Sequence, residues 1–257
     1  IISEKTIEYQ DMLKKRIEYF KRDLELYWEQ LQEYVKWGDI KKLSKYAKKS
    51  TIIDKKLTLA MAKIDEINEE EAAYGWELSW YPLRKQCADK LLPFKKLFDA
   101  GQEFMDKHHL WMHSQVGTYE PEDIEETIGN LYRAVYKLEK QFSDSPNSQR
   151  LATGIKVSID EFKLHLALIN TLGNPGMRDR HWEQVSEIIG FPIKKSPEMT
   201  LEKVIDYGLA EYVTKFEPIS ESATKENNLD KSEFNGLFTF KNLIKILKLS
   251  RHEQNDK

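Results

Sequence analysis

The chain has 257 residues, of which 40% are apolar and 32% are charged, and its net charge of -3 comes from 40 basic and 43 acidic side chains. This length is sufficient for one large core or two small ones, and the high charged fraction is typical of long helices with solvated faces. Because both signs are mixed along the chain, no broad basic face is available for phosphates or anionic lipid, which disfavours nucleic acids and membranes as partners. We expect proteins as partners.

The cysteine content indicates a context inside the cell. The single cysteine, Cys87, cannot form an internal disulfide, and a chain rich in Lys and Glu without a cysteine framework is typical of a reducing compartment. No apolar run approaches the roughly 18 residues needed to span a bilayer. The N-terminus has neither a hydrophobic signal core nor an initiator methionine. We therefore expect a processed or excerpted piece of a longer protein.

A heptad pattern covers the first segment. Its apolar residues follow one another at steps of 4,3,4,3,4,3 and predict a helical seam that needs a partner helix. The seam consists of Leu13, Ile17, Phe20, Leu24, Tyr27, Leu31 and Tyr34. Trp28 and Val35 are expected to widen the stripe, and Gly38 with Asp39 to end the helix. The basic run at 41–50 is interpreted as a solvated helix face or a connector.

The pattern predicts a second helix over 51–74, which ends near Gly75. Its apolar face is expected to hold Leu57, Met61 and Ile64, with an acidic tract at 65–71 opposite. Helical spacing continues from Trp76 to Met105, and Pro93 predicts either a kink or a restart. Two tryptophans four residues apart, Trp76 and Trp80, are typical of a core.

Proline in a first turn marks the next helix, which is expected to start near Pro121. Its apolar residues step by 4,3,4,3,4: Ile124, Ile128, Leu131, Val135, Leu138 and Phe142. The stretch 143–149 has nothing apolar to bury and predicts an exposed loop between two helical hairpins. A further helix is expected after it, with Ile155, Ile159, Phe162, Leu166 and Ile169 on one face.

The last part of the pattern is a turn and two short helices. Gly173 to Gly176 predicts the turn, Gly190 the end of a helix that carries Trp182, Val185 and Ile189, and Pro192 with Pro197 an extended link. Thr200 is expected to cap a last helix with Leu201, Val204, Ile205, Leu209 and Tyr212. With no convincing strand and no fixed repeat, we expect an all-α fold: an elongated, irregular array of antiparallel helix bundles without a sheet.

Motifs for nucleotide chemistry do not occur in the chain. Neither G-x-x-x-x-G-K-[ST] nor G-x-G-x-x-G is present, so we expect no catalytic site and no cofactor. Gly173-Asn-Pro-Gly176 has the spacing of the G-x-x-G loop of a KH domain, but that fold needs a sheet, and an ordinary turn between helices is the favoured interpretation.

Three histidines give a weaker hypothesis. His109 and His113 lie four residues apart, with His108 adjacent, which is a possible spacing for metal ligands. No H-E-x-x-H is formed and no third ligand is fixed, so the favoured interpretation is a partly buried aromatic helix end without a metal. Cys87 lies on an apolar stripe and is interpreted as a core residue, in preference to a nucleophile paired with one of these histidines.

The segment 173–191, GNPGMRDRHWEQVSEIIGF, closely resembles the signature of the second N-terminal region of dynein heavy chains. The matching positions are Asn174, Met177, Arg178, Arg180, His181, Trp182, Gly190 and Phe191. The elements T-L at Thr200, G-L at Gly208 and I-S-x-x-A-x-K-E at 219–226 continue the resemblance, which covers about 60–226. Residues 1–59 fit the helical tail that leads into it, and residues 227–257 depart from the family and resemble an alternative or truncated terminus.

The resemblance implies a mechanical role without catalysis. In such motors the linker is a curved rod of helix bundles over the AAA ring, and its bending converts ATP-driven ring movement into displacement of the tail on microtubules. The implied partners are the AAA ring with the rest of the heavy chain, and the intermediate, light intermediate and light chains. The implied location is the cytoplasm, the cytoskeleton and the ciliary axoneme, in an inner-arm-like heavy chain.

The same resemblance gives the signature residues an architectural role. Trp182 is expected to be buried, and Arg178 and Arg180 to tie helix ends or neighbouring backbone. Two other hypotheses remain open at this point. One is a general helical scaffold or coiled-coil adaptor that self-associates through the 13–34 seam, and the other is a metal-dependent helical enzyme built on His108, His109 and His113.

Overall fold

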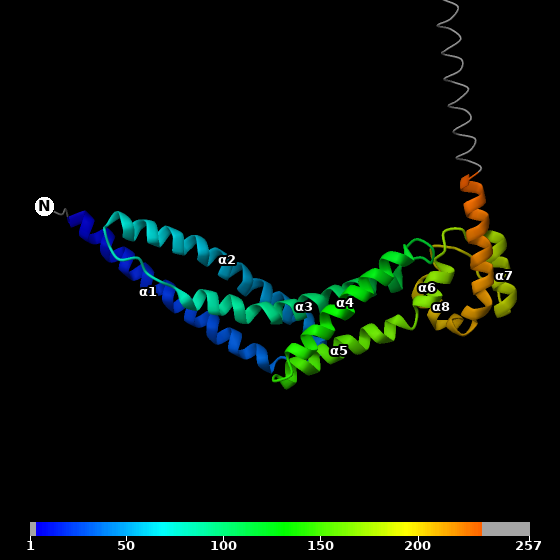
Figure 1. The fold of residues 1–257 in the computed structure, drawn as a ribbon, viewed down its shortest axis with the longest axis horizontal. Helices are drawn as coiled ribbons and strands as arrows, with labels where there is room; N and C mark the ends of the chain where they lie inside the picture. Colours follow the sequence, from blue (N-terminus) through cyan, green and yellow to red (C-terminus); the bar gives the residue numbers. More distant parts are fainter. Residues whose placement is uncertain (1–3, 233–257) are drawn as a thin grey trace, which may run out of the picture. The chain divides into compact units, whose positions relative to one another are not determined.

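The structure is a computed structural model that describes residues 4–232 (Figure 1). Within this range it contains helices and no strand, and its one isolated bridge joins Gln115 to Thr200. The predicted fold class, all-α without a sheet, is therefore confirmed for the described residues. In the same range, no helix is both long enough and apolar enough to cross a membrane.

The chain divides into two compact units, which are described separately. The first takes its residues from 1–107 and 128–161, and the second from 108–127 and from Phe162 onward. The long elements are α1 (Glu4–Gln32), η1 (Glu33–Lys36), η2 (Ile40–Lys42), α2 (Leu43–Ala73), α3 (Pro82–His113), α4 (Pro121–Gln141) and α5 (Pro146–Lys163). The short elements are α6 (Leu166–Leu172), α7 (Asp179–Ile189), α8 (Leu201–Asp206), η3 (Leu209–Tyr212) and a helix at 213–232.

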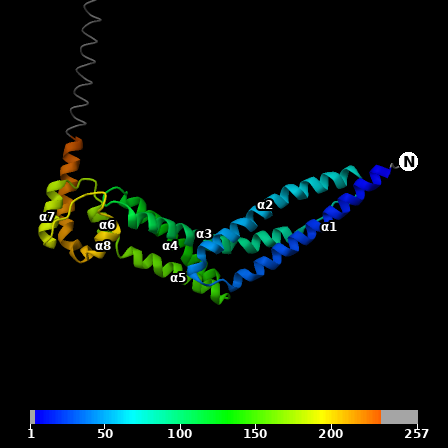
Figure 2. The ribbon, with the colours of Figure 1, turned by 180° about the vertical axis from the view of Figure 1, so that it is seen from behind.

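The seam of α1 is covered by the chain's own helices. Figures 1 and 2 show α2 and α3 beside α1 within the first unit. The buried seam residues are Leu13, Phe20, Leu24, Leu31 and Tyr34. Tyr34 packs its ring against Phe94 and Phe98 of α3, so the predicted partner helix lies in the same chain. The expected widening at Val35 is wrong, because this residue lies in η1 after the α-helix has ended and is 39% exposed.

Helix α2 begins earlier than predicted, and its buried face includes Leu57 as expected but not Met61. It starts at Leu43, so most of the basic run belongs to the helix. The buried positions are Leu43, Tyr46, Ala47, Ser50, Ile53, Leu57, Ala60, Ile67 and Glu71. Met61 is half-exposed, because it lies one position beyond the stripe that contains Ala60. Glu71 was expected on the solvated face but is buried, and it accepts hydrogen bonds from the Ser79 N–H at 2.7 Å and the Ser79 hydroxyl at 2.5 Å.

The segment between α2 and α3 is not helical, although its apolar spacing predicted a helix. Gly75 has a φ of +68° and ends α2 as expected. The next helix starts at Pro82, and a proline disfavours helical backbone at the residue before it, here Tyr81. Trp80 lies in this segment and is 82% exposed, so its assignment to the core is wrong. Pro93 does not restart the helix, because α3 is continuous through it.

Helices α4 and α5 follow the predicted pattern except at the loop between them. All six apolar residues predicted for α4 and its end are buried. The exposed loop expected at 143–149 is shorter, because α5 begins at Pro146 and Ser148 is buried. Proline is well suited to the first helical position, where its missing N–H has no partner to lose. The Ser145 hydroxyl donates to Ser148 Oγ at 3.0 Å across this first turn.

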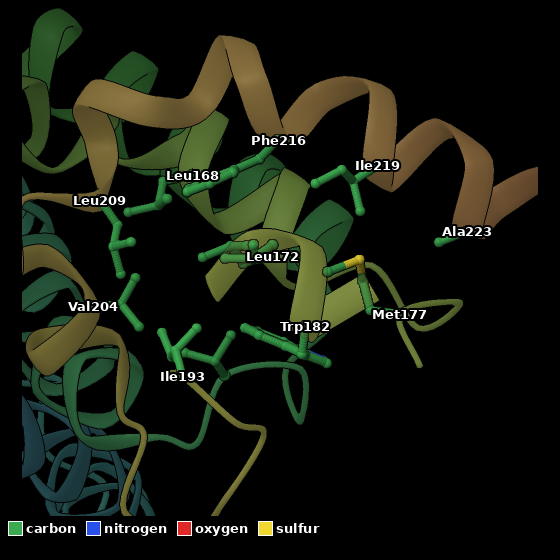
Figure 3. Close-up of a cluster of buried hydrophobic side chains, with 12 residues drawn as sticks. Leu168, Leu172, Met177, Trp182, Ile193, Val204, Leu209, Phe216, Ile219 and Ala223 are labelled. Carbon is green, nitrogen blue, oxygen red and sulfur yellow. The ribbon is translucent and has the colours of Figure 1, made fainter. Parts of the chain in front are cut away.

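The second unit is built around one apolar cluster (Figure 3). It contains Val116, Leu168, Leu172, Met177, Trp182, Val185, Ile193, Val204, Leu209, Phe216, Ile219 and Ala223. Two helices expected to be continuous are interrupted: His165 separates α6 from α5, and Gly208, with a φ of +70°, separates η3 from α8. Thr200 caps α8 as predicted, with its side chain accepting from the Lys203 N–H.

Candidate functional site

The candidate site is a turn at 173–178, here called the signature turn, together with the helix at 213–232, here called the anchor helix. The Asn174 side chain organises the turn, since its Oδ1 accepts from the Gly176 N–H at 2.8 Å. Its amide Nδ2 reaches the anchor helix and lies 2.8 Å from the Ser220 carbonyl oxygen, 2.8 Å from Ser220 Oγ and 2.7 Å from Thr224 Oγ1. One side chain therefore fixes the turn and ties it to the helix.

Two glycines allow the turn to approach its neighbours closely. A Cβ on Gly176 would lie 2.5 Å from the Ala223 carbonyl oxygen of the anchor helix, which is too close for a real contact. A Cβ on Gly173 would lie 2.5 Å from the Ile169 carbonyl oxygen and 2.8 Å from the Tyr119 ring. Both positions require glycine because backbone, which cannot swing aside, occupies the space.

The start of α7 adds charged contacts to the same helix. His181 is 2% exposed; its Nδ1 accepts from the Arg178 N–H at 3.0 Å, and its Nε2 lies 3.4 Å from Glu226 Oε2. The Arg180 guanidinium donates to Glu226, and the Arg178 guanidinium donates to Asp230. The hydrogen bond from Arg180 holds the pKa of Glu226 below its ordinary value. The arginines were expected to bind helix ends or backbone, and they bind carboxylate side chains instead.

The remaining signature residues pack or end the helix. Trp182 is 2% exposed and lies in the apolar cluster, as predicted, and its Nε1 has no hydrogen-bond partner among the described groups. Figure 3 shows Met177 and Trp182 across the apolar cluster from the anchor helix, which contributes Phe216, Ile219 and Ala223. Gly190 ends α7 with a φ of +83°, and Phe191 contacts the Tyr207 ring edge-on at 5.6 Å. The arrangement holds α7 and the anchor helix together.

The histidines of α3 do not assemble a metal centre. The rings of His109 and His113 stack at 4.3 Å, and His113 Nδ1 lies 2.8 Å from the His109 carbonyl oxygen. Among residues 4–232, no group of three His, Cys, Asp or Glu side chains is placed to hold a metal ion. The hypothesis of a metal-dependent enzyme therefore gains no support from this geometry.

Cys87 is a core residue, as its position on an apolar stripe predicted. It is fully buried, with Sγ 3.9 Å from the Leu24 carbonyl oxygen. Burial raises the pKa of the thiol to about 11. A thiol with such a pKa is a poor nucleophile at neutral pH, because only the thiolate attacks.

Sequence reasoning missed the anchor-helix half of the site. Ser220 and Ala223 lie in a segment that resembles a family element. Their partners, Asn174 and Gly176, lie 46 and 47 residues earlier in the chain. Asp230 lies beyond the point at which the resemblance was expected to end. No local pattern marks such pairs, since periodicity reports only which face is buried.

Comparison with known proteins decides the family. Residues 84–235 match the family model described as dynein heavy chain, N-terminal region 2. The chain is 36% identical to human dynein axonemal heavy chain 3 over 222 residues, which is 86% of this chain. The chain belongs to the dynein heavy chain family. It is also 27% identical to rat dynein axonemal heavy chain 1 over 64% of its length, and 26% identical to human dynein axonemal heavy chain 12 over 79%.

The matched ranges can be compared with the bounds expected from the sequence. The family match ends at residue 235, nine residues after Glu226, and includes Asp230. It also begins at residue 84, later than the expected start near 60. The matched segment spans 5% of human dynein axonemal heavy chain 3, 4% of rat dynein axonemal heavy chain 1 and 7% of human dynein axonemal heavy chain 12.

Proposed function

We propose that this chain forms the region of an axonemal dynein heavy chain in which the tail enters the mechanical linker. Residues 1–59 would belong to the helical tail, 60–226 to the N-terminal part of the linker, and 227–257 to a divergent segment. The role is structural: the region passes conformational change from the AAA ring to the tail and contributes no catalytic group. Membership of the dynein heavy chain family and the similarity to axonemal heavy chains support this proposal.

The observation that carries the proposal is the set of contacts that the signature turn and the start of α7 make with the anchor helix. An amide, two guanidinium groups and a glycine backbone contact the anchor helix over Ser220 to Asp230. Contacts distributed along three turns of a helix resist both sliding and tilting, because either movement breaks several of them together. A region that transmits displacement needs this resistance.

The partners and the location follow from the same proposal. The region would contact the AAA ring and the rest of the heavy chain, and it would assemble with intermediate, light intermediate and light chains. It would reside in the cytoplasm as part of the cytoskeleton, in the ciliary axoneme. The inner-arm assignment stays a prediction.

The test uses the complete heavy chain with Asn174→Ala and Arg180→Ala introduced together. Since the proposal separates mechanics from chemistry, we expect ATP turnover to stay within about twofold of wild type while microtubule gliding slows several-fold. Arg133→Ala is the matched control, because Arg133 is exposed and donates a hydrogen bond to Asn130, its neighbour on the same helix. Unchanged gliding, or ATP turnover that falls in proportion to gliding, would contradict the proposal.

The alternative of a coiled-coil adaptor is not favoured by any contact in the described residues. It depends on a free seam at 13–34, and five of the seven seam residues are buried against helices of the same chain. Self-association through this seam would require the first unit to open.

A further inference from the structure

Four histidines gather where the end of α3 meets the junction of α5 and α6, all within the second unit. Phe162 of α5 lies at the centre. Its ring centroid is 5.3 Å from that of His108 and 6.3 Å from that of His165, and Trp111 stacks on it at 5.3 Å. His109 and His113 extend the cluster along α3. The junction is thus built from aromatic contacts around Phe162, and two of the contacting rings, those of His108 and His165, can gain a proton.

The surroundings of His165 disfavour its protonated, positively charged form. Its Nδ1 is buried and has no hydrogen-bond partner among the described groups. A neutral ring tolerates this, since Nδ1 then carries only an unpaired lone pair. Protonation would place an N–H donor and a positive charge at the same point with no acceptor, which is unfavourable in an apolar setting. Burial lowers the pKa of His165 accordingly.

The surroundings of His108 also disfavour protonation. Burial lowers the pKa of His108, and the charges of His165, His109 and His113 lower it further. These three basic groups come from its own helix and from the α5–α6 junction. A carboxylate reaches the cluster from α8, where Glu202 Oε2 lies 3.8 Å from His113 Nε2, at the outer end of the row.

We propose that His108 and His165 form an acid-sensitive lock, in which neutral imidazoles let the end of α3 pack on the α5–α6 junction and protonation loosens that packing. The sign follows from linkage. A histidine whose pKa is lowered by folding contributes stability that is complete above its unfolded value of about 6.5, and this contribution is lost as pH falls below that value. The second unit would thus be regulated by acid without a metal or another ligand.

The first test is a titration of the wild-type chain by NMR with labelled histidine rings, which needs no variant to fold. We expect His108 and His165 to titrate clearly below the ordinary value of about 6.5. Their titrations should be coupled, since protonation of one ring opposes protonation of the other. Titration of both rings at or above the ordinary value would overturn the lock.

The second test measures amide hydrogen exchange over 162–172, corrected for the intrinsic effect of pH, at about pH 8 and about pH 5.5. In the wild type, protection should fall on acidification by up to tenfold for each unit of pKa depression. His165→Gln should reduce this fall, because an amide does not titrate. His113→Gln is the control and should keep it, since His113 has a carboxylate partner. An equal fall in the wild type and in His165→Gln would overturn the proposal.

Discussion

At the scale of single residues, Trp182 is held by apolar contact alone. It is enclosed by the cluster of the second unit, and its indole nitrogen donates to no described group. Its contribution to stability is therefore that of a large buried ring, without a hydrogen bond to lose. Its role at the signature position is the volume that the ring fills.

Trp182→Ala should lower the free energy of unfolding by about 3–5 kcal/mol, because it leaves a cavity and removes buried apolar surface. Trp182→Phe should cost much less, since a ring remains and no hydrogen bond is lost. Urea denaturation of both variants measures the difference. Equal stability of wild type and Trp182→Ala would show that the side chain is not part of the core.

Gly176 provides a prediction for the backbone contact with the anchor helix. Gly176→Ala should destabilise the chain by about 1–3 kcal/mol, because the new methyl group would overlap the Ala223 carbonyl oxygen. The control is Gly129→Ala in α4, where a Cβ meets nothing within 4 Å and helix propensity favours alanine. Thermal melting should shift down for the first variant and up for the second. A matching upward shift for Gly176→Ala would refute the close contact.

The sequence predicted which residues are buried better than it predicted their partners. Trp182, Cys87 and the α4 stripe are buried as expected, because burial follows helical period. The carboxylates that bind Arg178 and Arg180 lie more than 45 residues away, and no local pattern identifies them. Trp80 was assigned to the core because its spacing was helical, but the proline at 82 prevents the helix that would have buried it.

At the scale of elements, α1 and α2 are joined by a row of cation–π contacts. Lysines at seven-residue intervals on α2 lie over rings on α1 and the segment after it: Lys49 over Trp37, Lys56 over Tyr27 and Lys63 over Phe20, at 5.5, 5.1 and 6.0 Å. One heptad further on, Glu70 pairs with Arg16 at 2.5 Å. Lys49 of the basic run at 41–50 therefore makes a contact within the first unit.

Lys56→Gln should destabilise the α1–α2 pair by about 0.5–1 kcal/mol, the usual size of an exposed cation–π contact. Lys55→Gln is the matched control, because it removes the same charge from the exposed neighbouring position. The comparison requires the denaturation midpoints of both variants in low salt. Equal midpoints would indicate that the ring contact adds nothing beyond charge.

The pair of α4 and α5 carries a prediction for pH. Glu139 accepts from Lys156 at 2.5 Å and from Thr153 at 2.7 Å, and the hydrogen bonds from these two side chains lower its pKa. A lowered carboxyl pKa gives stability that is present above the unfolded value of about 4.3 and is lost as pH falls through the folded value. Glu139→Gln should therefore cost about 1 kcal/mol at neutral pH, and this cost should shrink as pH falls below the unfolded value of about 4.3. A cost that does not change with pH would contradict this assignment.

Helix boundaries were predicted correctly where a residue at the boundary itself ends or caps the helix. They were missed where the boundary depends on other contacts. Gly75, Gly190 and Thr200 end or begin helices as expected, since each acts through its own backbone or side chain. The loop at 143–149 was predicted too long, because its polar composition hid the helix start at Pro146. Pro93 left a kink or a restart open, and the apolar contacts of Leu91, Phe94 and Leu97 on both sides of it keep α3 continuous.

At the scale of the whole molecule, the chain belongs to the dynein heavy chain family and its described residues form two helical units. The family was identifiable from residues 173–191 because their order of glycine, arginine, histidine and tryptophan is specific. The division into units was not predictable, since α3, α4 and α5 each contribute residues to both. Within the second unit, the signature residues hold the anchor helix in place.

The most direct test is amide hydrogen exchange across the whole chain, comparing wild type with Asn174→Ala and Arg180→Ala combined. If the signature turn holds the anchor helix, exchange should accelerate over 173–182 and 213–232 and stay unchanged over 4–107, which belongs to the other unit. Unchanged exchange over 213–232 would mean that the anchor helix is held without these contacts, and the architectural role of the signature would be wrong.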